Sequence, residues 1–222
     1  MPNIQAVIFD YGLVLSGPPS PAAIEQILAL VEIDHARFDE LYWARRTDYD
    51  LGKLTGQTYW LDILKSAGRG PNTVLVDRLI ELDGQVWLTE NTPLLQWQST
   101  LHAKGVRSAI LSNMGDAVQR QIELNCPWIN RFEVRVWSNT VHITKPDPRI
   151  YMYILDQLGV DASNAVFIDD RLDNCQSALA LGIRAVQYTA IDWYSNLAAL
   201  APELAAHGLS VIDLNLENLQ AP

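Results

Sequence analysis

The chain has 222 residues, of which 49% are hydrophobic and 19% are charged, and its formal net charge is −10 at pH 7. This size and composition predict a folded protein with either one core plus an accessory element or two small domains, and they argue against a disordered chain. The acidic charge disfavours binding to nucleic acid or to anionic membranes. No apolar run is long enough to span a bilayer, and the N-terminal residues lack the pattern of a secretory signal, so we expect a cytoplasmic protein.

The first predicted element is a buried strand at residues 6–9, and Asp10 follows it directly. From residue 18 to residue 91 the sequence shows helical patterns only, over about a third of the chain. We therefore expect a small helical cap domain at 18–91, inserted after the first strand. Its helices are predicted within residues 20–32, 35–47, 55–68 and 72–84.

Strand and helix patterns alternate after residue 91. Several apolar runs in this part are continuous, which favours strands covered on both faces, as in a parallel sheet. The alternation implies right-handed crossovers and an α/β fold with a Rossmann-like, doubly wound parallel sheet. The predicted strands are 107–111, 132–137, 165–168 and 184–188, and the predicted helices are 92–104, 116–125, 148–159 and 172–182.

The end of the chain is predicted to add one helix after Asp192, interrupted at Pro202, and then an apolar segment at 210–214. Residues 1–17 and 92–222 are therefore expected to form the Rossmann-like core, with the cap domain at 18–91 between its two parts.

Polar side chains follow four of the predicted strands, where each strand ends. Taken singly, such residues have plainer roles, because an aspartate after a strand often begins a turn or caps a helix. In a parallel sheet, however, the carboxyl ends of the strands form the ligand crevice, so we expect these side chains to converge. The residues concerned are Asp10, Ser112 with Asn113, Lys145, and Asp169 with Asp170.

Three of these converging groups are carboxylates. Carboxylates gathered in one crevice repel each other and raise one another's pKa unless a cation joins them. Ligand sets made of oxygen atoms favour a hard cation such as Mg²⁺. The sequence therefore predicts a magnesium site built from Asp10, Asp169 and Asp170.

The order of these motifs resembles that of the haloacid dehalogenase superfamily, most of whose members are phosphatases. The stretches that carry the resemblance are VIFDYGLVL, LSN, KPDPRIY and FIDDRLDN, and it extends from about residue 4 to residue 188. The helical insertion after the first motif resembles the small cap of subfamily I. The resemblance implies a hydrolase of phosphoric monoesters.

The resemblance also implies roles for individual residues. Asp10 would be a nucleophile that forms an aspartyl phosphate. Lys145 would neutralise charge in the transition state, while Ser112 and the main-chain N–H of Asn113 hold the phosphoryl oxygens. Asn174 would orient Lys145 or a metal-binding carboxylate. The residues expected to hold Mg²⁺ are Asp10, the main-chain carbonyl of Gly12, Asp170, and Asp169 directly or through water.

Gly12 departs from the pattern of the family. Most phosphatases of the superfamily carry a second aspartate at this position, which protonates the leaving oxygen and later activates water. Gly12 keeps the main-chain carbonyl but offers no proton, and general acid catalysis is typically worth about 10²–10⁴-fold. Some phosphatases of the superfamily that act on sugar phosphates also carry glycine here, so the departure is compatible with phosphatase activity.

Two other functions remain open from the sequence. A 2-haloacid dehalogenase also uses an aspartate nucleophile and releases halide without a proton, but it needs no metal and leaves Asp169 and Asp170 unexplained. A catalytically weakened binding protein of the same fold would explain Gly12 but not the retained Asp10, Lys145 and Asp170.

An enclosing cap favours small substrates over proteins or nucleic acid. We therefore expect a small phosphorylated metabolite, such as a sugar phosphate, as the partner of a monomer or a homodimer. Four aromatic residues of the insertion either line the substrate pocket or pack the cap helices together: Trp43, Tyr49, Tyr59 and Trp60.

Overall fold

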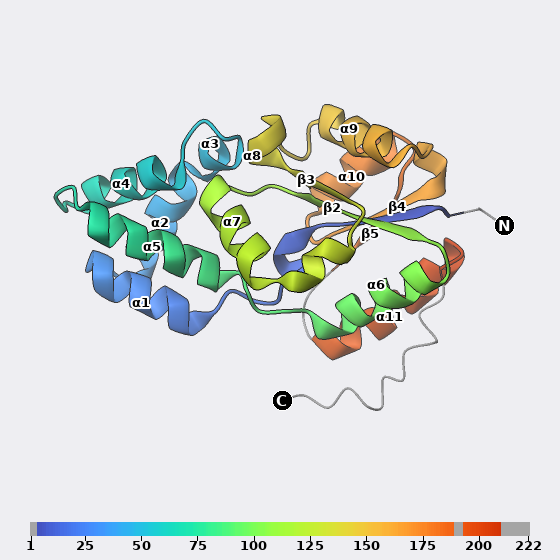
Figure 1. Cartoon of the computed structure of the whole chain (residues 1–222), viewed down its shortest axis with the longest axis horizontal. Coiled ribbons are helices and arrows are strands. Elements are labelled where there is room, and N and C mark those ends of the chain that lie inside the picture. Colours follow the sequence, from blue (N-terminus) through green and yellow to red (C-terminus); the bar gives the residue numbers. More distant parts are fainter. Residues whose placement is uncertain (1–3, 189–192, 210–222) are drawn as a thin grey trace.

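The structure is a computed structural model, and it describes residues 4–188 and 193–209 (Figure 1). Five parallel strands form one sheet in the order β3-β2-β1-β4-β5. This order places β1, the first strand of the chain, at the centre of the sheet. The strands are β1 (Ala6–Phe9), β2 (Arg107–Ser112), β3 (Val134–Trp137), β4 (Ala165–Asp169) and β5 (Arg184–Gln187).

Helices cover both faces of the sheet, as the continuous apolar runs predicted. On one face, Val7 and Phe9 pack beneath α6 (Thr92–Ala103), α7 (Asp116–Asn125) and α11 (Trp193–Ala206). On the other face, Ala6 and Ile8 pack beneath α9 (Pro148–Leu158) and α10 (Leu172–Ala180). The fold is therefore the Rossmann-like, doubly wound α/β sheet expected from the sequence.

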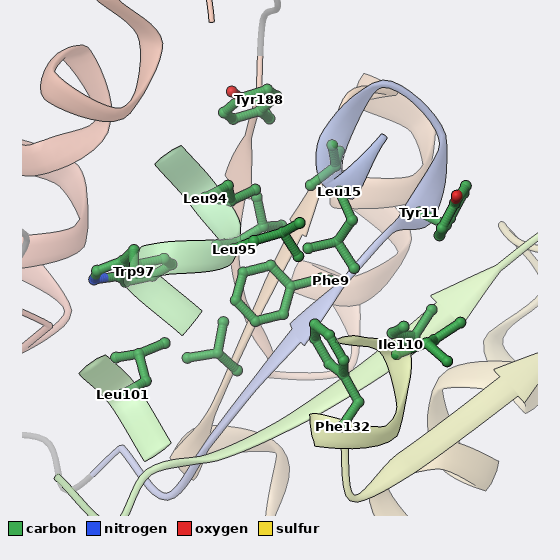
Figure 2. Close-up of a cluster of buried hydrophobic side chains, with 14 of the residues drawn as sticks. Phe9, Tyr11, Leu15, Leu94, Leu95, Trp97, Leu101, Ile110, Phe132 and Tyr188 are labelled. Atoms are coloured by element: carbon green, nitrogen blue, oxygen red, sulfur yellow. The ribbon is translucent and has the colours of Figure 1, made fainter. Parts of the chain in front are cut away.

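Large aromatic side chains fill the first of these two layers, as Figure 2 shows. The Phe9 ring lies edge-on to Trp97 and to Phe132, with ring centroids 5.9 Å apart in both pairs. Such edge-to-face pairs are worth about 0.5–1.5 kcal/mol beyond the area that they bury. This packing fixes the end of β1, and it thereby fixes Asp10, the residue that follows.

A short π-helical turn at Tyr11–Leu15 follows β1, and five α-helices lie between it and α6. We call residues 18–91 the helical insert. The helices pack around an apolar core of their own, beside the carboxyl end of the sheet (Figure 1). Four of them begin at an N-cap residue whose side chain accepts a hydrogen bond from a main-chain N–H. The helices are α1 (Pro21–Val31), α2 (His35–Ala44), α3 (Arg46–Asp50), α4 (Gly56–Ser66) and α5 (Thr73–Val86), and the N-caps are Ser20, Asp34, Thr55 and Asn72.

One of the helices predicted for the insert is in fact two. The pattern at 35–47 predicted a continuous helix, but Arg45 has a non-helical ψ of 16°, and the chain changes direction there. The short helix α3 follows. Its residues contact the core, because the Ser138 hydroxyl donates to the Asp50 carbonyl and the Leu51 carbonyl lies 3.0 Å from His142 Nδ1.

The insert and the core approach closely at Gly115, just before α7. A Cβ added to Gly115 would lie 2.1 Å from the Tyr49 ring, so only glycine fits there. The neighbouring Asp116 carboxylate accepts a hydrogen bond of 2.8 Å from the Gly56 N–H of the insert. These contacts hold the insert against the carboxyl end of the sheet.

Other element boundaries differ by small amounts from the prediction. Strand β3 begins at Val134 rather than at 132, because Phe132 follows a 3-10 turn and packs into the core. It is followed by a four-residue helix, α8 (Ser138–Val141). The helix expected after Asp192 is present, but α11 runs through Pro202 without the predicted interruption. The segment predicted at 210–214 lies outside the described residues. None of the helices in the described ranges is long and apolar enough to cross a membrane.

Candidate active site

The predicted site residues meet at the carboxyl end of the sheet, around a cavity of about 250 Å³. Because the strands are parallel and neighbouring, their ends bring together side chains that are far apart in sequence. Lys145 enters from the loop after α8 rather than from a strand end. All the predicted site residues except Asp169 line the cavity: Asp10, Gly12, Ser112, Asn113, Lys145 and Asp170.

Lys145 lies between two carboxylates. Its Nζ is 2.9 Å from Asp10 Oδ1 and 2.6 Å from Asp169 Oδ2, and the residue is only 4% exposed. Burial alone would lower the pKa of Lys145, but the two carboxylates raise it above its ordinary value. Burial also raises the pKa of Asp10 to about 7, although Lys145 acts against this rise. The lysine is therefore held as a cation against Asp10.

Asp169 is bound on both oxygens. Oδ2 meets Lys145, while Oδ1 accepts hydrogen bonds of 2.9 Å from Asn174 Nδ2 and from the Arg171 main-chain N–H. Asp170 instead lines the cavity, and burial followed by repulsion from Asp169 raises the pKa of its carboxyl. The two adjacent aspartates thus differ, because one holds neighbouring groups and the other faces the cavity.

The three aspartates fit a hard divalent cation. Carboxylate oxygens of Asp10, Asp169 and Asp170 lie within 4.8 Å of one another. Lys145 is the one cation that contacts them among the described residues, so the cluster keeps an excess of negative charge. Asn174 lines the same cavity, and its buried Oδ1 has no hydrogen-bond partner in the described part of the chain. A water on a bound Mg²⁺ would supply a donor to it.

Asn113 does more than its motif indicated. Its side chain closes a pair of hydrogen bonds with the main chain of Lys145, donating to the carbonyl over 2.9 Å and accepting from the N–H over 2.8 Å. This contact ties the loop after α8 to the end of β2. It sets the position of the lysine, and Ser112 and Asn113 themselves line the cavity.

Gly12 is not required by the backbone conformation. Its φ is −63° and its ψ is 128°, values that any residue adopts. A Cβ on residue 12 would lie 3.8 Å from Cζ3 of Trp87, an ordinary van der Waals contact. The space and the conformation for a side chain are therefore present.

The helical insert supplies the opposite wall of the cavity. Its lining residues are Trp43, Arg46, Asp50 and Trp87. Arg46 Nε donates to Asp50 Oδ1 over 2.9 Å, and Nη1 donates to the Tyr42 hydroxyl. The sequence did not indicate Arg46, Asp50 or Trp87 as site residues, because they belong to no motif. It also gave no reason to distinguish the buried Arg46 from its exposed neighbour Arg45.

The four aromatic residues considered from the sequence divide between the two roles. Trp43 lines the cavity and is 55% exposed. Tyr49, Tyr59 and Trp60 are fully buried in the core of the insert, where the Tyr49 and Tyr59 rings stack with centroids 4.4 Å apart. Packing therefore accounts for three of them.

Curated relatives cover parts of this chain. The chain is 29% identical over 198 residues to acyl-CoA dehydrogenase family member 10 of Mus musculus, covering 83% of the chain and 18% of that protein. It is 34% identical over 100 residues to bifunctional epoxide hydrolase 2 of Sus scrofa, covering 43% and 18%. It is 27% identical over 110 residues to phosphatase MT3486 of Mycobacterium tuberculosis, covering 49% and 51%. The chain thus spans 18% of the length of the first two relatives.

Solved structures share the fold. A HAD family enzyme of Bacteroides thetaiotaomicron superposes with a TM-score of 0.74 at 20% identity, covering 88% of this chain and 98% of that chain. Its complex with magnesium and inorganic phosphate gives 0.71 at 21% identity, covering 85% and 96%. The L-2-haloacid dehalogenase of Xanthobacter autotrophicus gives 0.61 at 17% identity, covering 91% and 83%.

The family assignment rests on the sequence as well as on the fold. A family model described as haloacid dehalogenase-like hydrolase matches residues 4–182, which is most of the chain. This range contains all four of the motifs that carried the resemblance, and it includes the helical insert. The chain therefore belongs to the haloacid dehalogenase-like hydrolases.

Proposed function

We propose that this protein is a Mg²⁺-dependent phosphatase that hydrolyses a small phosphorylated metabolite, such as a sugar phosphate, through an aspartyl phosphate on Asp10. One observation carries the proposal. A buried lysine joins Asp10 to Asp169 at the carboxyl end of the sheet, with Asp170 beside them and an excess of negative charge. A phosphatase site needs this combination, because it must bring a carboxylate against a phosphate dianion.

The residues of the chain divide the work of the reaction. Asp10 attacks phosphorus in line. Lys145 offsets the repulsion between this carboxylate and the phosphoryl oxygens, and the Asn113 side chain keeps the lysine in place. The Ser112 hydroxyl and the main-chain N–H of Asn113 donate to phosphoryl oxygens. Mg²⁺, when bound, supplies further positive charge to the phosphate.

The residues that would hold Mg²⁺ are Asp10, Asp170 and the main-chain carbonyl of Gly12. Asp169 is fully buried, and both its oxygens already accept hydrogen bonds. We therefore assign Asp170 as the direct ligand, and Asp169 as the residue that positions Lys145 or holds a metal-bound water.

We propose that the helical insert, residues 18–91, acts as a cap that selects the leaving group. Its side chains Trp43, Arg46 and Asp50 face the same cavity as Asp10. The small cavity volume, about 250 Å³, favours a small metabolite over a protein or a nucleic acid. Dehalogenase action remains the second candidate, because Gly12 provides no acid and halide needs none.

Metal removal separates these candidates. Hydrolysis of an aryl phosphate should be lost in EDTA and restored by added Mg²⁺, because Asp10, Asp169 and Asp170 need a cation to hold phosphate nearby. Release of halide from a 2-halopropionate, measured in EDTA, is the parallel assay. Full phosphatase activity in EDTA would contradict the metal assignment, whereas halide release without phosphate release would favour the dehalogenase. The absence of both activities would favour a binding protein.

A further inference from the structure

The cavity contains a positive group that the proposed reaction has not used. Among the described residues that line the cavity, Lys145 is bound to Asp10 and Asp169, and the exposed Arg171 pairs with Asp173 outside the cavity wall. Arg46 of the insert remains. It lines the same cavity as Asp10 but belongs to the insert rather than to the end of the sheet. In an in-line displacement the leaving group departs on the side away from the nucleophile.

The guanidinium of Arg46 is held in one orientation. The residue is 8% exposed, Nε donates to Asp50, and Nη1 donates to Tyr42. The rings of Tyr42, Tyr49 and Trp43 surround it, with centroids 5.1, 5.6 and 5.8 Å from its Cζ. Nη2 makes no hydrogen bond to any residue that the structure describes. A fixed donor in a cavity wall stabilises charge without the cost of reorientation.

Arg46 is connected, through two aromatic side chains, to the space that residue 12 leaves vacant. A Cβ on Gly12 would meet the ring of Trp87 at 3.8 Å. The Nε1 of Trp87 donates over 3.4 Å to the Tyr42 hydroxyl, which also accepts from Arg46. Residue 12 therefore adjoins Trp87, Arg46 bonds to Tyr42, and the hydrogen bond between Trp87 and Tyr42 links the two positions.

We propose that Arg46 stabilises the negative charge on the leaving oxygen, in place of the acid that Gly12 lacks. This inference rests on the proposed phosphatase function. As Asp10 bonds to phosphorus, the bond from phosphorus to the leaving oxygen breaks, and its electron pair stays on that oxygen. Arg46 remains protonated, as guanidinium does in proteins, and donates hydrogen bonds to the alkoxide.

The protons then balance through water. The alkoxide takes a proton from water, which leaves hydroxide and releases the alcohol. Hydroxide attacks the phosphorus of the aspartyl phosphate, and the bond from Asp10 to phosphorus breaks with its electron pair returning to the carboxylate. The products are the alcohol and inorganic phosphate. Asp50 donates no proton in this scheme, and its role is to accept the hydrogen bond that orients Arg46 Nε.

The test is the leaving-group dependence of kcat in the holoenzyme with Mg²⁺. Arg46→Ala should lower kcat by roughly 10²-fold on primary alkyl phosphates, as loss of an oxyanion donor does elsewhere, and much less on aryl phosphates. Arg46→Lys, which keeps the charge but not the planar fork, should fall between. Arg45→Ala, an exposed neighbour paired with Asp62, is the matched control and should leave the series unchanged.

Chemical rescue distinguishes this role from a structural one. Millimolar guanidinium should restore part of the alkyl phosphatase activity of Arg46→Ala, and NaCl at the same ionic strength should not. Three results for Arg46→Ala would overturn the inference: an equal loss of kcat across all esters, a change in KM alone, or an unchanged kcat. If Arg46→Ala fails to fold, the same criteria apply to Arg46→Lys. A steepened dependence in Asp50→Asn but not in the Arg46 variants would also overturn it, and would identify Asp50 as a proton donor.

The two proposals fail in different ways. A native protein with no turnover of any phosphate ester in Mg²⁺ would overturn the phosphatase function and this inference with it. A native phosphatase whose Arg46 variants lose all esters equally would overturn only the role of Arg46.

Discussion

Two buried cations, Lys145 from the core and Arg46 from the insert, face one cavity, and their surroundings differ. Lys145 is a compact charge with two carboxylates at 2.6 and 2.9 Å. The planar guanidinium of Arg46 donates one hydrogen bond from Nε to Asp50 and one from Nη1 to the Tyr42 hydroxyl. A lysine ammonium is a point charge, whereas a guanidinium offers five donors in a fixed fork.

The difference shows what each side of the cavity lacks. On the core side, one cation contacts a cluster of three carboxylates, and the missing component is positive charge. On the insert side, the cation keeps donors beyond those that its neighbours use, and the missing component is an acceptor. A metal ion satisfies the first side, and a leaving group that becomes negative satisfies the second.

The largest effect is expected where the core side loses its nucleophile. Asp10→Asn should lower turnover of an aryl phosphate by roughly 10⁴-fold or more, because the amide does not attack phosphorus. The fold should survive, since the side chain is nearly isosteric. Thermal unfolding of the purified variant is the control. Turnover near the native level, with contaminating phosphatase excluded, would show that another residue is the nucleophile.

The next effect is expected on removal of the lysine that bridges the two carboxylates of the core. Lys145→Met should destabilise the protein by about 3 kcal/mol, because removing one partner leaves buried carboxylates unpaired. Lys53→Met, at an exposed ion pair with Asp48, should change stability by less than about 1 kcal/mol. Urea unfolding measures both. If Lys145→Met were as stable as the native protein, Asp10 and Asp169 would have to take up protons without a cost in free energy.

The core side could be predicted from the sequence because its residues stand at recognisable places. Asp10, Ser112 and Asp169 mark the ends of apolar strands, and parallel strands bring such ends together. Lys145 has no such position, since a short helix and a loop separate it from β3. The sequence pattern grouped it with the end of the third strand, and the resemblance of its motif to a known family gave a second reason to expect it at the site.

The insert side could not be predicted in the same way. Arg45 and Arg46 are adjacent and chemically identical in the sequence. The helix breaks at Arg45, and only the second arginine becomes buried. This break is accompanied by tertiary contacts with the core, including the approach of Tyr49 to Gly115 and the hydrogen bond from Ser138 to Asp50. The helical periodicity of residues 35–47 is a local pattern, so it does not predict such tertiary contacts.

A smaller effect on kcat is expected from a variant that supplies the missing acid at residue 12. The φ and ψ of Gly12 permit a side chain, and a Cβ would meet only Trp87 at 3.8 Å. Gly12→Asp should therefore fold and should raise kcat on primary alkyl phosphates by about 10-fold, below the usual range for general acids because the site is not otherwise adapted to it. Aryl phosphates should gain least, since their leaving groups need no proton.

The measurement is a series of phosphate esters of graded leaving-group pKa, with chemistry rate-limiting. The kcat of the native protein should depend steeply on the leaving-group pKa, because Arg46 donates hydrogen bonds but transfers no proton. The gain from Gly12→Asp should be larger when Arg46 is alanine, since the two groups would assist the same oxygen. A flat dependence in the native protein would show that some other residue supplies the proton.

The smallest effect concerns the protonation of Asp83, a buried carboxyl in the insert whose pKa Arg46 influences. Asp83 is fully buried in the insert and accepts a hydrogen bond of 2.7 Å from Tyr42. Burial raises the pKa of the Asp83 carboxyl, and the attraction of Arg46 only partly opposes this. The folded protein then holds this proton more tightly than the unfolded chain does. Stability should therefore fall as the pH rises from about 4, the usual aspartate pKa, toward neutrality.

Asp83→Asn should make this pH dependence less steep, because the amide binds no proton in either state, while Asp10 and Asp170 keep their own raised pKa values. Asp147 provides the opposite case, since hydrogen bonds from Arg149 lower the pKa of its carboxyl to about 2. That contribution is present above the unfolded pKa and is lost as the pH falls, so Asp147→Asn should instead reduce the loss of stability in acid. Urea midpoints at pH 3, 4, 5.5 and 7 compare the two variants. If Asp83→Asn keeps the native slope between pH 4 and 7, Asp83 is ionised in the folded protein. Arg46 would then lie between two carboxylates, and the insert side would share the excess of negative charge found on the core side.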